Sequence, residues 1–286
     1  MSERGREDIP IRRLKGWRLI LRYILLAAAA ALFLLPLYWM IVSSLKPEYE
    51  VFAVPPAWWP SPPLWQNYRK ALTELPFGRY ALNTILIAVG AVIGHVVSCS
   101  LVAYGFAKLR APGKNVLFII LLATLMLPYP VVMIPQYIIF SELDWVNTLK
   151  PLIVPTFFGN AFYIFLLRQF FMQIPNDLID AAKIDGANLL QIIWYVILPI
   201  SRQAIATVAI FTFQFAWNDF LAPLIYLQDQ SRYTLMLGLR FFRSSFEVNW
   251  AYLMAASLSI AAPVIVLFFF TQRAFISGIS MGSLKE

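Results

Sequence analysis

The 286-residue chain has little of what most catalytic and metal-binding sites require. Its only cysteine is Cys99 and its only histidine is His95, so it can form neither a disulfide nor a cluster of cysteine and histidine metal ligands. Only 13% of its residues are charged, about half the fraction usual in soluble domains. We therefore expect no enzyme active site, no metal site and no cofactor bound by this chain.

A phosphate-binding P-loop is also missing from the sequence. That loop needs Gly-x-x-x-x-Gly-Lys-Ser/Thr, so that backbone amides and the lysine can hold phosphates. The nearest fragment, APGKN at 111–115, lacks both the first glycine and the hydroxyl residue. If ATP drives this protein, another chain must hydrolyse it.

Apolar residues are abundant, at 60% of the chain with a mean hydropathy of +0.69. A helix needs about 20 mostly apolar residues to cross a bilayer, and hydrocarbon requires every backbone polar group to be paired within such a segment. Six windows meet this requirement: 23–42, 80–107, 116–140, 151–167, 203–227 and 251–271. The predicted fold class is an all-α polytopic membrane protein with six transmembrane helices, forming a single domain over 1–286.

The basic residues predict how these helices are oriented. If the N-terminus is cytoplasmic, the segments on that side contain 15 lysines and arginines and those on the other side contain 8. By the positive-inside rule, both the basic N-terminus 1–22 and the tail 272–286 are then cytoplasmic. Seven of the basic residues lie in 1–22, beside the first window, where they suit contact with anionic membrane lipid, so the net charge of +8 does not indicate nucleic-acid binding.

No small-residue cleavage site ends the first window, which is expected to remain as a span.

Prolines interrupt two of the windows. Pro128, Pro130 and Pro135 lie in the third, and Pro151 and Pro155 open the fourth. Proline removes a backbone donor and kinks a helix, which in a transport protein can mark a hinge or an opening toward a cavity. Membrane helices also tolerate proline without any such role, and both interpretations stay open.

The segment 174–199 places charged residues between the fourth and fifth windows, in the sequence IPNDLIDAAKIDGANLLQIIWYVILP. Pro175 suits the first turn of a helix, and Asp177 and Asp180 favour its positive N-terminal end. Gly186 can adopt the positive φ that ends a helix. One short helix is therefore predicted before this glycine.

A second short helix is predicted after the glycine. Asn188 is a good N-cap for a helix over 189–197, and Pro199 is expected to close the segment. The result is a pair of cytoplasmic helices between the fourth and fifth spans. The alternative is that this segment is only a solvated loop connecting two spans. Its mixture of alanine and isoleucine with acids, beside a fixed turn, instead favours a surface that binds in a groove of a partner.

The segment DAAKIDGA at 180–187 resembles the EAA loop of the membrane subunits of binding-protein-dependent ABC importers. The acid–Ala–Ala triplet, the Asp–Gly pair and the later Leu198–Pro199 all stand in register, although Asp180 replaces the usual glutamate. Nearly the whole chain resembles the maltose-type carbohydrate importers, and in particular the shorter of their two homologous permease subunits. The fragments that carry this likeness are FAWNDFLAPLIYL at 215–227, YTLMLGL at 233–239, WAYLMAA at 250–256 and QRAFISGISMGSLKE at 272–286.

The resemblance implies a permease subunit in a bacterial or archaeal cytoplasmic (inner) membrane, forming half of a translocation pathway for a sugar or sugar derivative. It implies four partners: a second homologous permease subunit, a dimer of ATP-binding subunits that carries the ATP and Mg, an extracytoplasmic solute-binding protein and the small-molecule substrate. The residues implied to couple to the ATPase are Asp180, Ala181, Ala182, Asp185, Gly186 and Ala187. The tail residues implied to contact the ATPase dimer are Gly278, Gly282 and Lys285.

Candidates for the solute pathway come from polar and aromatic residues within the windows. Tyr163 and Trp217 can stack on a sugar ring and Asn218 can hydrogen-bond to it, while Asp219 is the one acid of the fifth window. Helix packing is the alternative role for these residues. His95 is a candidate proton relay, because intramembrane ionisable groups are functional candidates by default.

A secondary transporter or channel for a small polar solute is the alternative function. Such a protein normally needs intramembrane charges for ion coupling or a filter, and only Asp219 and His95 are available here. It would also have no need for an EAA loop. A membrane-bound sensor or scaffold fits less well, because the sequence contains no signalling domain.

Overall fold

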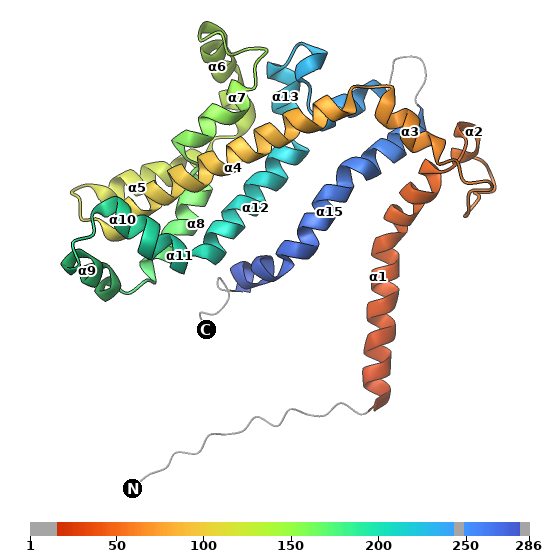
Figure 1. The fold of residues 1–286 in the computed structure, drawn as a ribbon. Coiled ribbons are helices and arrows are strands. Elements are labelled where there is room, and N and C mark those ends of the chain that lie inside the picture. Colours follow the sequence, from red (N-terminus) through yellow and green to blue (C-terminus); the bar gives the residue numbers. More distant parts are fainter. Residues whose placement is uncertain (1–15, 243–248, 281–286) are drawn as a thin grey trace.

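The computed structural model describes residues 16–242 and 249–280. These residues form helices and no strand (Figure 1), which confirms the all-α prediction. Four helical segments are long and apolar enough to cross a membrane, and two bent helix pairs raise the number to six if each pair counts as one span. The chain is a multi-pass membrane protein.

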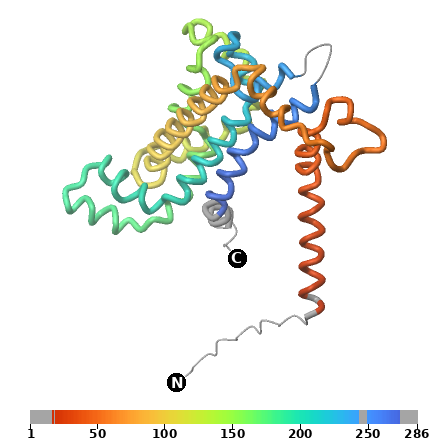
Figure 2. Tube along the Cα trace, turned by 45° about the vertical axis from the view of Figure 1, so that its right-hand side comes forward, coloured from red at the N-terminus to blue at the C-terminus, as the bar shows by residue number. Residues whose placement is uncertain are grey.

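Helix α1 (Gly16–Ser44) contains the first predicted span and stands apart from the other helices along most of its length (Figures 1 and 2). None of its most apolar window is buried, and burial begins only toward its C-terminal end, near Trp39. A helix that is apolar on every side is stable when lipid surrounds it. The exposed leucines of α1 are therefore what a membrane-spanning helix requires.

Helix α4 (Phe77–Lys108) is the longest helix in the described part of the chain. It packs against α8 (Ala161–Met172) and α12 (Arg202–Asn218), and α15 (Trp250–Ser280) packs against α12. Small residues let membrane helices approach closely. At Gly94 an added Cβ would collide with the side chain of Thr156, so this glycine is required for the close contact between α4 and the segment before α8.

The third predicted span, 116–140, is not one straight helix. It consists of α5 (Lys114–Ala123), the 3-10 turn η1 (Thr124–Met126) and α6 (Tyr129–Glu142). The two halves meet at 99°. Leu127 is extended, with φ −80° and ψ 113°, because the following Pro128 disfavours a helical residue before it. The prolines therefore mark a real break in this span.

The fourth and fifth predicted spans are helical but also contain breaks. The fourth starts as α7 (Lys150–Ile153) and η2 (Val154–Phe158), and the fifth ends as α13 (Leu221–Tyr226). Gly159, with φ 90°, breaks the fourth span, and Asn160 then caps α8 by accepting from two backbone N–H groups. The fifth breaks at Asp219, which is extended at the end of α12.

Short helices connect the long ones at the end of the molecule where α1 finishes. They are α2 (Glu48–Val51), α3 (Gln66–Thr73), η4 (Gln230–Arg232), α14 (Leu235–Gly238) and η5 (Leu239–Phe242). The last helix, α15, continues beyond the predicted 251–271 span as far as Ser280.

A buried polar cluster joins α1 to α3. The side-chain amide of Asn67 donates to the carbonyl oxygens of Ser44 at 2.9 Å and Lys46 at 2.8 Å. The Lys46 ammonium donates to the carbonyl of Ala57 at 2.5 Å. Burial lowers the pKa of Lys46, and Glu50 partly opposes that shift. Three hydrogen bonds thus fix the chain as it leaves α1.

We expect Asn67→Ala to destabilise this end of the protein by roughly 2–3 kcal/mol, because it leaves two buried carbonyl groups without their donor. Thermal unfolding of the purified protein in detergent measures the effect. The matched control is Gln66→Ala, since Gln66 is an exposed neighbour on the same helix. Equal unfolding temperatures for the two variants would contradict the role given to Asn67.

Candidate functional site

The 174–199 segment folds as the sequence predicts at its start and extends further at its end. It consists of α9 (Asn176–Ile184), α10 (Leu189–Ile192), the π-helical turn η3 (Ile193–Ile197) and α11 (Leu198–Ile200). The second helical stretch does not close at Pro199, because Pro199 lies in the first turn of α11, where its missing N–H is tolerated. The direction changes by 85° at Ser201, before α12.

Hydrogen bonds on both sides fix the turn between α9 and α10. Gly186 has φ 84°, as predicted. Its N–H donates to the carbonyl of Lys183 at 3.0 Å, and the N–H of Ala187 donates to that of Ala182 at 2.9 Å, which together form a Schellman motif. Asn188 then starts α10 with a capping box. The angle between the two helices is therefore set by local geometry.

The residues predicted to couple to an ATPase divide between the surface and the core. Those exposed are Asp180, Ala181, Asp185 and Gly186, whereas Ala182 and Ala187 are partly buried against the core. Asp180 accepts a hydrogen bond from the Lys183 ammonium at 2.8 Å. Both side chains of this ion pair are about 60% exposed, so the pair adds little stability. Ile184, the isoleucine beside these residues, is an apolar side chain that is 86% exposed.

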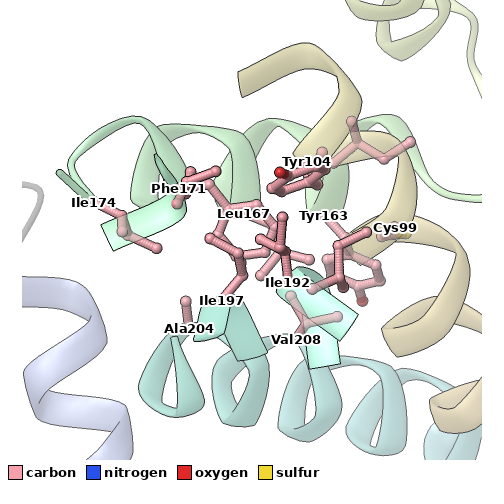
Figure 3. Close-up of a cluster of buried hydrophobic side chains, with 14 residues drawn as sticks. Cys99, Tyr104, Tyr163, Leu167, Phe171, Ile174, Ile192, Ile197, Ala204 and Val208 are labelled. Atoms are coloured by element: carbon pink, nitrogen blue, oxygen red, sulfur yellow. The ribbon is translucent and has the colours of Figure 1, made fainter. Parts of the chain in front are cut away.

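The inner face of the same segment belongs to one hydrophobic cluster (Figure 3). Ile179 of α9 and Ile192 of α10 are buried in it, together with Ile197. The other elements contribute Leu167 and Phe171 from α8, Ala204 and Val208 from α12, and Cys99, Ala103 and Tyr104 from α4. The α9 segment is therefore packed into the same core as α8 and α12, and close-packed interiors transmit strain.

A second candidate site is a cavity of about 150 Å³ between α4, the interrupted fourth span and α12. The polar residues that line it are His95, Thr156, Asn160, Tyr163, Thr212 and Asp219. His95 Nδ1 lies 3.2 Å from the hydroxyl of Thr212 and its ring meets that of Tyr163 edge to face, with the centroids 5.1 Å apart. Tyr163 also belongs to the hydrophobic cluster in which Ile179 of α9 is buried, so the cavity adjoins that cluster.

The structure brings together two of the four residues predicted to line the solute pathway. Tyr163 and Asp219 line the cavity. Trp217 is buried elsewhere, where its indole N–H donates to the carbonyl of Ile260 at 3.2 Å, and Asn218 donates to the carbonyl of Gln214 within its own helix. Consecutive helical residues do not share a face. That all four residues line the pathway stays a prediction.

The signal that sequence reasoning missed is helical spacing. Counting back from Asp219 in steps of three and four residues reaches Ala216, Phe215 and Thr212, and all of them line the cavity. Asn160 follows a glycine inside an apolar run, which is a typical break signal. His95, a functional candidate from the sequence, also lines the cavity.

Two further expectations concern metals and the tail. Within residues 16–242 and 249–280, no group of three or more His, Cys, Asp or Glu side chains could hold a metal ion. Gly278 lies on α15, while Gly282 and Lys285 are outside the described residues. Contact of this tail with an ATPase stays a prediction.

Residues 96–280 match the family of the binding-protein-dependent transport system inner membrane component. The sn-glycerol-3-phosphate transport system permease protein of Yersinia pestis is 32% identical over 265 residues, which cover 90% of this chain and 94% of that one. The diacetylchitobiose uptake system permease protein of Streptomyces coelicolor is 30% identical over 269 residues, covering 91% and 87%.

Among solved structures, a chain of a bacterial ABC transporter involved in the import of the acidic polysaccharide alginate is similar in fold. The TM-score is 0.80 and the sequences are 23% identical. The alignment covers 96% of this chain and 99% of the other. At this identity the likeness shows the fold alone.

Proposed function

The chain belongs to the family of binding-protein-dependent transport system inner membrane components, and we propose that it forms half of an import pathway for a sugar or sugar derivative, driven by a partner ATPase. The observation that carries this proposal is the α9 segment. Its outer face exposes acids and an isoleucine, while its inner face is packed into the core of the helices. With this arrangement the α9 segment can contact a partner on one face and pass a displacement to the membrane helices through the other.

The orientation proposed from the basic residues places both termini and the α9 segment in the cytoplasm. The count of 15 lysines and arginines against 8 supports it. An ATP-binding subunit is cytoplasmic, and α9 would dock in a cleft on its surface. The partners proposed are two copies of that subunit with their ATP and Mg, a second permease subunit and an extracytoplasmic solute-binding protein.

Docking would use the exposed residues around Asp180. Its carboxylate is paired with Lys183 in the isolated chain, and that pair is exposed enough to exchange for a basic residue of the partner. Ile184 would enter an apolar contact. When the ATP-binding subunits close, the displacement of α9 would pass through Ile179 to α8 and α12 and so reach the cavity wall at Tyr163.

We expect the purified chain alone to hydrolyse no ATP, because it contains no P-loop, and we expect hydrolysis to appear when it is reconstituted with its partner subunits in proteoliposomes. Release of inorganic phosphate and uptake of labelled sugar are measured in the same vesicles. Liposomes with the partner subunits but without this chain are the control. Uptake by the chain alone, driven by an ion gradient, would instead indicate a secondary transporter.

A further inference from the structure

The cavity lies where two interrupted helices meet the middle of α4. One break is at Gly159, just before α8, and the other is at Asp219, just after α12. Both Asn160 and Asp219 line the cavity, together with His95 from the middle of α4. Inside a membrane, irregular backbone is tolerated where it is buried in protein or lines a polar cavity, and solute sites form at such breaks. The position therefore favours a solute site over simple packing.

The charges around this cavity are unfavourable for an anion. Asp219 lines it with a carboxylate, and none of the lysines and arginines in the described part of the chain does so. The N-terminus of α8 opens beside the cavity and would attract negative charge if it were free. Two of its N–H groups are instead occupied, because the Asn160 side chain accepts from Phe162 at 3.0 Å and from Tyr163 at 3.3 Å.

The remaining groups suit hydroxyl groups and the flat face of a sugar. One Asp219 oxygen accepts from the N–H of Ala222 at 3.2 Å, and carboxylate oxygens can accept further bonds from solute hydroxyls. Thr212 and His95 form a hydrogen-bonding pair on the opposite helices. Phe215, which is 73% exposed, supplies an apolar surface at the edge. A few polar groups on an apolar wall are typical of small-molecule sites.

We propose that this cavity is a solute subsite which accepts a neutral polyhydroxylated compound and excludes anions such as phosphate esters, with Asp219 as the residue that sets the charge preference. This inference rests on the proposed transport function and adds the charge of the solute. In the charge of its solute, the chain would then resemble the relative named for diacetylchitobiose, a neutral sugar, and differ from the relative named for sn-glycerol-3-phosphate.

Charged thiol reagents test the proposal without knowledge of the solute. Ala216 lines the cavity, and Ala216→Cys in a chain with Cys99→Ser supplies one thiol there. The full complex in membranes is treated with methanethiosulfonates carrying either ethyltrimethylammonium or ethylsulfonate, and each rate is divided by that of the same reagent with free mercaptoethanol. We expect the cationic reagent to react about tenfold faster. Phe215→Cys is a second position should the first variant fail to fold.

Two aspartate variants and one solute complete the test. Asp219→Asn should reduce the rate ratio to within about twofold, whereas the control Asp229→Asn, at an exposed acid outside the cavity, should leave it unchanged. Added sn-glycerol 3-phosphate should not slow the labelling. Equal rates for both reagents, an unchanged ratio in Asp219→Asn, or protection by sn-glycerol 3-phosphate would each overturn the proposal. Labelling needs no ATP, so failure here is distinguishable from failure of ATP-driven transport.

Discussion

Replacing Gly186 by proline is expected to abolish the stimulation of ATP hydrolysis in the assembled transporter. Gly186 has φ 84°, whereas proline holds φ near about −65°. Proline would also remove the N–H that donates to Lys183 in the turn. A cost of about 3 kcal/mol to the docked conformation corresponds to roughly a hundredfold fewer competent complexes. Solute-stimulated phosphate release from the complex in proteoliposomes measures the effect.

The control for this variant keeps the backbone and changes only the side chain. Asparagine adopts positive φ more readily than other non-glycine residues, and no atom lies within 4 Å of a Cβ added at this position. Gly186→Asn should therefore retain most of the stimulation. Co-purification of the ATP-binding subunit shows whether the proline variant fails to dock or docks without coupling. Normal stimulation in Gly186→Pro would mean that the 174–199 segment is a passive connector.

The local chemistry of this segment could be predicted from the sequence, because each feature depends on a few neighbouring residues. A glycine with positive φ and an asparagine N-cap are determined by backbone sterics and by one or two hydrogen bonds. The π-helical turn over 193–197 and the 85° bend before α12 could not be predicted in this way. Ile192 and Ile197, at the two ends of this turn, are buried against helices distant in the sequence, and local rules do not describe such packing.

The cavity shows a different limit of sequence reasoning. The chemistry of Tyr163 and Asp219 suits a solute pathway and both line the cavity, but the chemistry of Trp217 is equally suitable and Trp217 packs against α15. Chemistry alone does not tell which helix face a residue occupies, whereas the spacing from Asp219 back to Thr212 does. Hydropathy averaged over the fourth window does not reveal the break at Gly159, and only the Gly159–Asn160 pair within that window indicates it.

Among the described glycines, Gly94, at the contact between α4 and the fourth span, should tolerate an added methyl group least. A Cβ at Gly94 would collide with the Thr156 hydroxyl and come within 3.0 Å of both the Thr156 Cβ and the Phe157 ring. Separating the two segments would also move the Thr156 carbonyl, at 3.0 Å, away from the Ser98 hydroxyl, whose proton this carbonyl shares with the Gly94 carbonyl at 2.7 Å. We expect Gly94→Ala to lower the free energy of unfolding by roughly 1–3 kcal/mol through overpacking.

Gly105 offers a matched control for this prediction, because it lies on the same helix and a Cβ there meets no atom within 4 Å. Gly105→Ala should be neutral or stabilise the protein by up to about 1 kcal/mol, since alanine favours helix more than glycine does. The temperature at which the detergent-solubilised protein loses its monodisperse peak in size-exclusion chromatography should fall by roughly 5 °C in Gly94→Ala relative to Gly105→Ala. Because Thr156 also lines the cavity, the same variant should change the rate at which Ala216→Cys is labelled. Equal stability of the two alanine variants would mean that α4 and the fourth span are separated more widely than this contact requires.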